Sequence, residues 1–118
     1  MNTKAVLVKI VDIFTSLGFY EEMINGRRNF IKGNTYCIAN YVETIGFLIE
    51  YANSRDEALK NWHEDSDAFS VELGEEEILK GIKKDILSNV PELRITTIPT
   101  TPNFVDVPIR TGVAQSAL

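Results

Sequence analysis

The residues most able to do chemistry lie in one stretch of 14 residues that holds seven carboxylates and no Lys or Arg. These acids are Glu64, Asp65, Asp67, Glu72, Glu75, Glu76 and Glu77. A carboxylate pair can act as general acid and base where an apolar pocket raises the pKa of one member. The acids here follow one another through polar sequence, so we expect solvent to keep them ionised. They then form either a solvated face or a docking surface for a basic partner.

A metal site is the second chemistry that this stretch suggests. Asp65-Ser66-Asp67 resembles the start of a calcium loop, which has oxygen ligands at its fifth and twelfth positions and Gly at its sixth. Here the fifth and sixth positions are Phe69 and Ser70, and only Glu76 at the twelfth fits. One Cys and one His are too few for a zinc site. We therefore expect no metal and no cofactor.

The single histidine and the single cysteine do not complete a catalytic set. His63 could be a general base oriented by Asp65 or Asp67, but a cation at a helix end explains it equally well. Cys37 lies in an apolar, strand-like run without a neighbouring cation, which predicts a buried and unreactive thiol. We expect no enzymatic activity.

Composition is that of an ordinary globular domain, with 118 residues, 44% of them hydrophobic and 25% charged. The net charge of −5 disfavours nucleic acid and anionic membrane surfaces, because both attract Lys and Arg. It favours a basic protein partner. The apolar run at residues 5–14 is too short and too charged to span a membrane, and no signal-peptide cleavage site follows it. We expect a cytoplasmic protein.

The elements that must position the acids can be predicted from periodicity. Apolar residues at helical spacing predict a helix over residues 3–17, and residues 20–24 add a turn before the turn signal Asn25-Gly26. Strand-like runs with short connections then predict an antiparallel meander: residues 27–32, 35–42 and 46–52.

Two further helices flank the acidic stretch. Ser54 and Glu57 form a capping box for a short middle helix that ends at Trp62. Its inward residues are predicted to be Ala58, Leu59 and Trp62. Residues 68–73 alternate as a fourth strand, and Gly74 opens a last helix whose first turn holds the three consecutive Glu residues. The apolar stripe of this helix consists of Ile78, Leu79, Ile82, Ile86 and Val90.

The predicted fold class is therefore α+β, an antiparallel β-meander of about four strands with an N-terminal helix, a short middle helix and a C-terminal helix. We assign residues 1–90 to this single domain. Residues 91–118 are rich in Pro and Thr and have no sustained period, which predicts an extended or disordered tail.

The stretch from Phe47 to Leu87 is similar to small immunity proteins that are encoded beside polymorphic toxins in Gram-positive bacteria. The shared features are an "IEYA" strand, a capped helix with an Ala-Leu face, an acidic turn, a short strand ending in "LGEEE" and an Ile/Leu-striped helix. The segment "LGFYEE" at residues 17–22 also fits, so the resemblance covers roughly residues 3–90. Ser66 stands where the pattern has Gly.

This resemblance implies a protein that binds one cognate toxin stoichiometrically inside the producing cell. The acidic surface favours a basic toxin domain as this partner, and we expect a monomer or weak homodimer. The predicted partner-binding residues are Trp62, Glu64, Asp65, Asp67, Phe69, Glu72, Glu75, Glu76 and Glu77. Trp62, Phe69, Tyr20 and Tyr41 are the candidate aromatic anchors. Two alternatives stay open: a phage- or host-directed inhibitor that imitates the charge of nucleic acid, and a non-catalytic, oligomeric structural protein.

Overall fold

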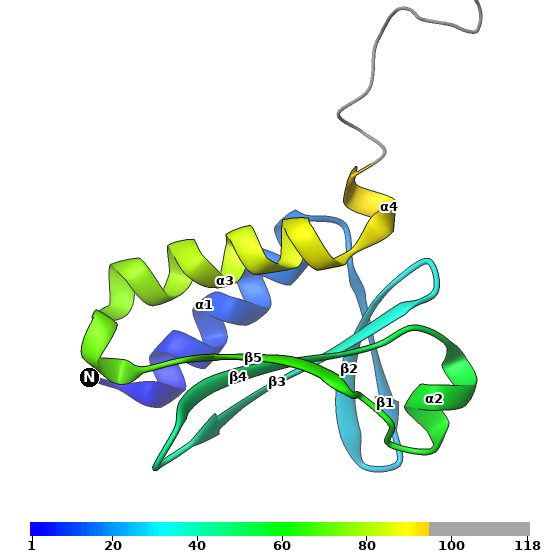
Figure 1. The fold of residues 1–118 in the computed structure, drawn as a ribbon, viewed down its shortest axis with the longest axis horizontal. Helices are drawn as coiled ribbons and strands as arrows, with labels where there is room; N and C mark the ends of the chain where they lie inside the picture. The colour runs from blue at the N-terminus through cyan, green and yellow to red at the C-terminus, as the bar shows by residue number, and fades with distance from the viewer. Residues whose placement is uncertain (95–118) are drawn as a thin grey trace, which may run out of the picture.

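The computed structural model describes residues 1–94, which form the α+β fold shown in Figure 1. Its helices are α1 (Thr3–Ser16), α2 (Arg55–Leu59), α3 (Glu75–Asn89) and α4 (Pro91–Arg94), with a 3₁₀ turn, η1 (Val71–Leu73). Its strands are β1 (Tyr20–Ile24), β2 (Arg27–Lys32), β3 (Thr35–Val42), β4 (Gly46–Ala52) and β5 (Asp65–Phe69).

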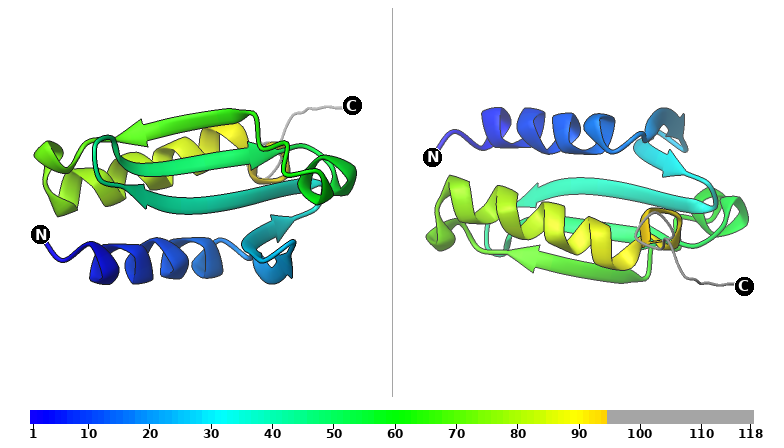
Figure 2. Two further views of the ribbon diagram at one scale, coloured as in Figure 1. Left: turned by 90° about the horizontal axis from the view of Figure 1, so that it is seen from below. Right: turned by 90° about the horizontal axis from the view of Figure 1, so that it is seen from above.

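The five strands form one antiparallel sheet in the order β1-β2-β3-β4-β5. Each strand therefore pairs with its neighbours in sequence, as short connections favour. Both long helices pack on one face of the sheet, where α3 covers the β4–β5 side and α1 lies beside β3 (Figures 1 and 2). The predicted α+β class and antiparallel meander are confirmed, with one strand more than expected.

The main core follows from helical spacing on α1 and α3. Val6, Ile10 and Phe14 are fully buried on α1, and Ile78, Ile82 and Ile86 are fully buried on α3. They meet alternate side chains of β4, namely Phe47, Ile49 and Tyr51. A second, smaller cluster under α2 contains Ile24, Ile31, Tyr36, Ala52 and Ala58. The helix-facing side of the sheet thus carries most of the apolar packing.

Residues 20–24 form a strand, so the predicted turn at this place is wrong. Asn25 and Gly26 have φ values of 54° and 75°, which suit a two-residue hairpin that turns β1 back onto β2. The pair Ile24 and Arg27 closes this hairpin. The polar sequence of β1 hid the strand, because only Ile24 among its residues is buried.

The middle helix and the fourth predicted strand are shorter or shifted. The Ser54 hydroxyl caps α2 by accepting from the Glu57 N–H at 3.2 Å, as expected, but the helix ends at Leu59. Asn61 then adopts a φ of 59°, which turns the chain before Trp62. Leu59 and Trp62 are therefore 46% and 51% exposed, and their predicted inward position is wrong. The strand predicted over residues 68–73 is β5, which ends at Phe69.

α4 lies within the segment predicted to be an extended or disordered tail, so that prediction is wrong for residues 91–94. The Glu92 carboxylate accepts hydrogen bonds from the Asn34 N–H and from the Thr35 hydroxyl, both at 3.0 Å. Although burial opposes it, these bonds lower the pKa of Glu92. The contacts fasten α4 to the β2–β3 turn. The rest of the predicted tail, residues 95–118, lies outside the described residues.

Candidate functional site

The sequence-predicted acids lie along one border of the sheet, on the residues just before β5, on β5 and η1, and on the first turn of α3. We call this surface the acidic edge and define it as Glu64, Asp65, Asp67, Glu72, Glu75, Glu76 and Glu77. Six of these side chains are exposed, and Glu75 is half-buried. Because β5 is the last strand of the sheet, no strand of the described chain covers its outer side.

Local sequence explains how the acidic edge is built. The Ser70 hydroxyl accepts from the Glu72 N–H at 3.2 Å and so caps η1 directly after β5. Gly74, with a φ of 84°, then turns the chain into α3. The three Glu residues that follow stand at the positive end of the helix dipole, which stabilises them there.

Ion pairs neutralise only two of the seven acids. Glu75 pairs with Lys9 of α1, and Glu77 pairs with Lys80 at 3.6 Å. Both pairs are exposed to solvent, where such pairs contribute little to stability. Among the described residues the other five acids of the edge form no ion pair. The acidic edge therefore keeps an excess of negative charge that a partner can use.

Behind β5 lies a carboxyl group on α3, Asp85, that is not among the residues predicted from sequence. The Tyr51 hydroxyl donates to Asp85 Oδ2 at 2.7 Å, and Asp67 of β5 is close enough to interact with the same carboxyl group. Burial, followed by the Asp67 carboxylate, raises the pKa of Asp85 to about 6. Burial and Asp85 also raise the pKa of Tyr51, so the phenol stays a hydrogen-bond donor.

A sequence signal for Asp85 existed. It follows Ile82 by three residues and Ile78 by seven, which places a charged group at the border of the apolar stripe of α3. Nothing in the sequence, however, shows that Asp67 lies opposite this position. The pairing of β5 with β4 supplies that information.

The predicted aromatic anchors do not lie at the centre of the acidic edge. Trp62 precedes β5, whereas η1 and α3 follow it, and a five-residue strand spans roughly 17 Å. The Trp62 ring also makes a cation–π contact within the protein, since Lys60 Nζ lies 4.7 Å from the ring centroid. The structure therefore does not bring Trp62 together with the three Glu residues of α3.

The other aromatic candidates are also elsewhere or occupied. Phe69 is half-buried in the main core, where a Cβ added at Gly81 of α3 would come within 3.1 Å of its ring. Tyr41 is half-buried with its ring centroid 5.1 Å from that of Phe47. Tyr20 is exposed but belongs to β1, at the opposite border of the sheet.

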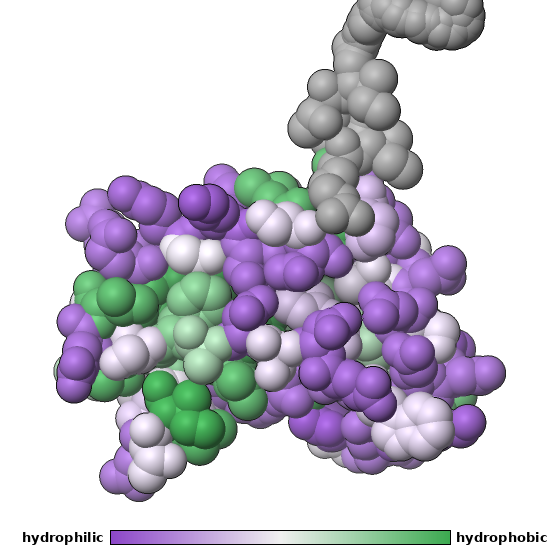
Figure 3. Space-filling model, viewed as in Figure 1, coloured by the Kyte–Doolittle hydropathy of each residue, from purple (hydrophilic) through white to green (hydrophobic). Residues whose placement is uncertain are grey.

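Instead, an apolar patch of aliphatic side chains adjoins the acidic edge. We define it as Ile45, Val71 and Leu73, which are 48%, 37% and 52% exposed. Figure 3 shows hydrophobic surface gathered at the end of the molecule where the β3–β4 turn and η1 lie. Glu72 stands between two members of the patch in the chain. The strand predicted over residues 68–73 would bury one face, so the sequence does not reveal this patch.

Gly46 holds the β3–β4 turn against the end of β5 and so positions the patch. Its φ is 117°, a conformation that L side chains rarely adopt. A Cβ at this position would lie 2.3 Å from the carbonyl oxygen of Phe69. The close approach of these two backbones requires glycine and places Ile45 beside the start of η1.

His63 is buried and does not face the acidic edge, which contradicts both of its sequence interpretations. Its Nε2 lies 2.8 Å from Oδ1 of Asn29, and its Nδ1 has no partner among the described residues. Burial, and then Arg27, lower the pKa of the imidazole, which is therefore neutral near pH 7. A neutral histidine bonded to an amide is neither a base oriented by aspartate nor a cation at a helix end.

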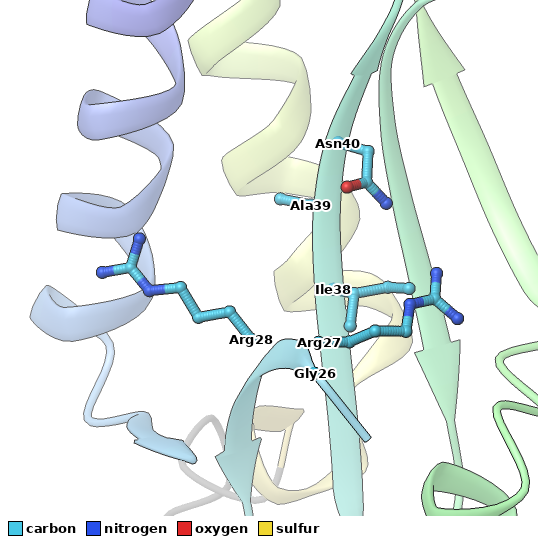
Figure 4. Close-up of a pocket in the computed structure, with 6 residues that line it drawn as sticks. All are labelled: Gly26, Arg27, Arg28, Ile38, Ala39 and Asn40. Carbon is cyan, nitrogen blue, oxygen red and sulfur yellow. The ribbon is translucent and has the colours of Figure 1, made fainter. Parts of the chain in front are cut away.

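Cys37 is fully buried in the main core, as predicted, and burial raises the pKa of its thiol further. The neighbouring basic residues of β2 do not form one patch. In Figure 4, Arg27 and Arg28 point to opposite sides of β3, around a pocket of about 180 Å³. Glu21 binds Arg28 through two hydrogen bonds of 2.6 and 3.0 Å. This pairing leaves little positive charge for a nucleic-acid site.

Comparison of the chain with protein-family models, with curated proteins and with solved structures finds no match. Within residues 1–94, no group of three or more His, Cys, Asp or Glu side chains is arranged to hold a metal ion. No helix in this part of the chain combines the length and the apolar character needed to cross a membrane. The acidic edge and the apolar patch are thus the features from which a function can be inferred.

Proposed function

We propose that this protein binds one basic protein partner and blocks its activity, as an immunity protein neutralises a cognate toxin. The observation that carries the proposal is the apolar patch of Ile45, Val71 and Leu73, which lies beside the unpaired Glu72 and Glu76 at one end of the acidic edge. Protein interfaces combine an apolar centre with a polar rim in this way. The resemblance of residues 3–90 to small immunity proteins supports the same function.

The two parts of this surface have different physical roles. The unpaired carboxylates raise the rate at which a cationic partner associates, because complementary charge steers the encounter. The aliphatic side chains lose contact with water in the complex, which slows dissociation. An inhibitor of this kind needs no chemistry of its own.

Two acids are suited to a test of the proposal, Glu72 and Glu76. Both are exposed, and neither forms an ion pair among the described residues, so their reversal breaks no bridge. Reversal of Glu76 in the first turn of α3 costs about 0.3–1 kcal/mol through the helix dipole. Circular dichroism and thermal melting check that the variants remain folded.

The experiment uses the tagged full chain to isolate a partner from cells of its native host. We expect a one-to-one complex with a basic protein, inhibition of that protein's activity, and loss of the complex when Glu72→Lys and Glu76→Lys are combined. An acidic partner, an uninhibited partner or a complex that resists the double reversal would contradict the proposal.

A further inference from the structure

β5 has a backbone side that no strand of residues 1–94 pairs with. Hydrogen-bonded positions alternate along an antiparallel ladder. The two-residue turn Gly33-Asn34 makes Lys32 and Thr35 a hydrogen-bonded pair, and the register of the strand pairs carries this alternation across β3 and β4. Asp65, Asp67 and Phe69 consequently direct their backbone groups to β4. Ser66 and Ala68 direct theirs outward.

The outward positions have no strand partner among the described residues, because β5 ends the sheet. Both Ser66 and Ala68 are exposed. Edge strands with free N–H and C=O groups are templates for another strand. The outer side of β5 can therefore accept one more strand without any change in the fold.

The side chains beside this free backbone are acidic. Asp65 and Asp67 share the helix-facing side of β5, since they pair with Tyr51 and Ile49 of β4. No cation among the described residues pairs with either carboxylate. Asp67 also interacts with the half-buried Asp85 behind it. This row of carboxylates lacks the positive charge that would offset its repulsion.

A second copy of this chain is a poor occupant of the edge. Full-length antiparallel pairing of two β5 strands would place Asp67 opposite Asp67. Like charges directly opposite each other on one sheet face are destabilising. The same acids would attract a strand with Lys or Arg at the matching positions.

We propose that β5 binds an extended strand of a basic partner by antiparallel strand addition, with Lys or Arg facing Asp65 and Asp67. This inference rests on the proposed function and names its docking mode. Residues opposite the two acids form non-hydrogen-bonded pairs, in which side chains are closest. An apolar residue then faces Phe69, next to the patch. Because the pairing is antiparallel, the sequence of the partner strand from its N-terminus is apolar-x-basic-x-basic, opposite Phe69, Asp67 and Asp65 in turn.

The first test titrates the isotope-labelled protein with the blocked peptide Thr-Val-Thr-Lys-Thr-Lys-Thr and follows its amide NMR signals. We expect the amides of Ser66 and Ala68 to shift and their hydrogen exchange to slow. A control peptide of the same composition, Thr-Val-Thr-Thr-Lys-Lys-Thr, presents its lysines on opposite faces and should bind about threefold to fivefold more weakly. A peptide that leaves both amides unchanged overturns the inference.

The second test removes single backbone donors. N-methylation of the third or fifth peptide residue, which face Ala68 and Ser66, should weaken binding about fivefold or more, whereas N-methylation of the first lysine, whose N–H points away, should not. On the protein, Ser66→Pro removes an outward N–H without removing a hydrogen bond to β4 and should behave likewise, with Ser66→Ala as the control for the lost hydroxyl.

The outcomes separate this inference from the proposed function. Equal effects of N-methylation at all three peptide sites, or equal binding by the two Ser66 variants, would overturn strand addition. Strand addition could fail these tests while the peptides bind the variant that combines Glu72→Lys and Glu76→Lys more weakly than the original protein. Docking through charge would then stand without strand pairing. If neither the backbone changes (N-methylation and Ser66→Pro) nor the combined Glu72→Lys and Glu76→Lys changed the affinity for the peptides, both proposals would be contradicted.

Discussion

At the scale of single residues, Asp85 lies between the buried Tyr51 and a second carboxylate, and neither neighbour supplies positive charge. Its folded pKa of about 6 is higher than the value of 3.8 for an unperturbed group. The contribution of this carboxyl group to stability is therefore complete below about pH 3.8 and is lost as the pH rises through about 6.

Asp85→Asn should consequently stabilise the protein at pH 7 by roughly 1 kcal/mol, a value reduced for solvent screening of this half-buried group. The amide oxygen can still accept from Tyr51. At pH 3.5 the variant and the original protein should have nearly equal stability, since both then carry a neutral group. Urea unfolding at the two pH values measures the difference, and an equal effect at both would contradict this account of Asp85.

At the scale of elements, the β3–β4 turn depends on Gly46. Gly46→Ala would force a methyl group against the Phe69 carbonyl and should destabilise the protein by about 1–3 kcal/mol. Gly26→Ala is the matched control, because its φ of 75° is also positive but no atom lies within 4 Å of the added Cβ. Thermal unfolding should show a larger loss for Gly46→Ala. Equal losses would mean that the turn does not rest on β5.

The elements that could be predicted from sequence are those whose apolar period faces a core. β2, β3 and β4 have the predicted bounds, and the stripe of α3 is buried as expected. β1 and β5 were missed or shifted because most of their residues face solvent, which leaves no apolar alternation to read. The exposure of Trp62 depends on where α2 ends, and a left-handed Asn61 gives only a weak sequence signal.

The residues of the acidic edge could be predicted from the sequence, but their positions relative to Trp62 and to the apolar patch could not. Seven acids in one stretch are visible in the sequence, and the structure keeps them on one border of the sheet. The strand between Trp62 and η1 separates the predicted anchor from the acids of α3. Ile45 joins the patch only because β3 and β4 turn back at that end of the sheet. The length of β5 decided the first point, and the contact of the β3–β4 turn with the end of β5 decided the second.

At the scale of the whole molecule, negative charge is unevenly placed. Outside the acidic edge, two acids of the described chain form ion pairs, Glu21 with Arg28 and Glu22 with Arg55. Among the described residues, five acids without an ion pair follow one another along the acidic edge, whereas others, such as Asp12 and Asp56, lie singly on α1 and α2. If this surface steers a basic partner, the position of the charges must matter more than their total.

The most direct test is the rate constant of association with the isolated partner, measured by stopped flow at several salt concentrations. Glu72→Lys with Glu76→Lys is compared with Asp12→Lys and Asp56→Lys, a pair of exposed acids on α1 and α2. Each pair adds four positive charges to a net charge of −5, so both variants have a net charge of −1. We predict that the first pair slows association about tenfold or more at low salt and flattens its salt dependence, while the second pair has a small effect. Equal slowing by both pairs would contradict a docking role for the acidic edge.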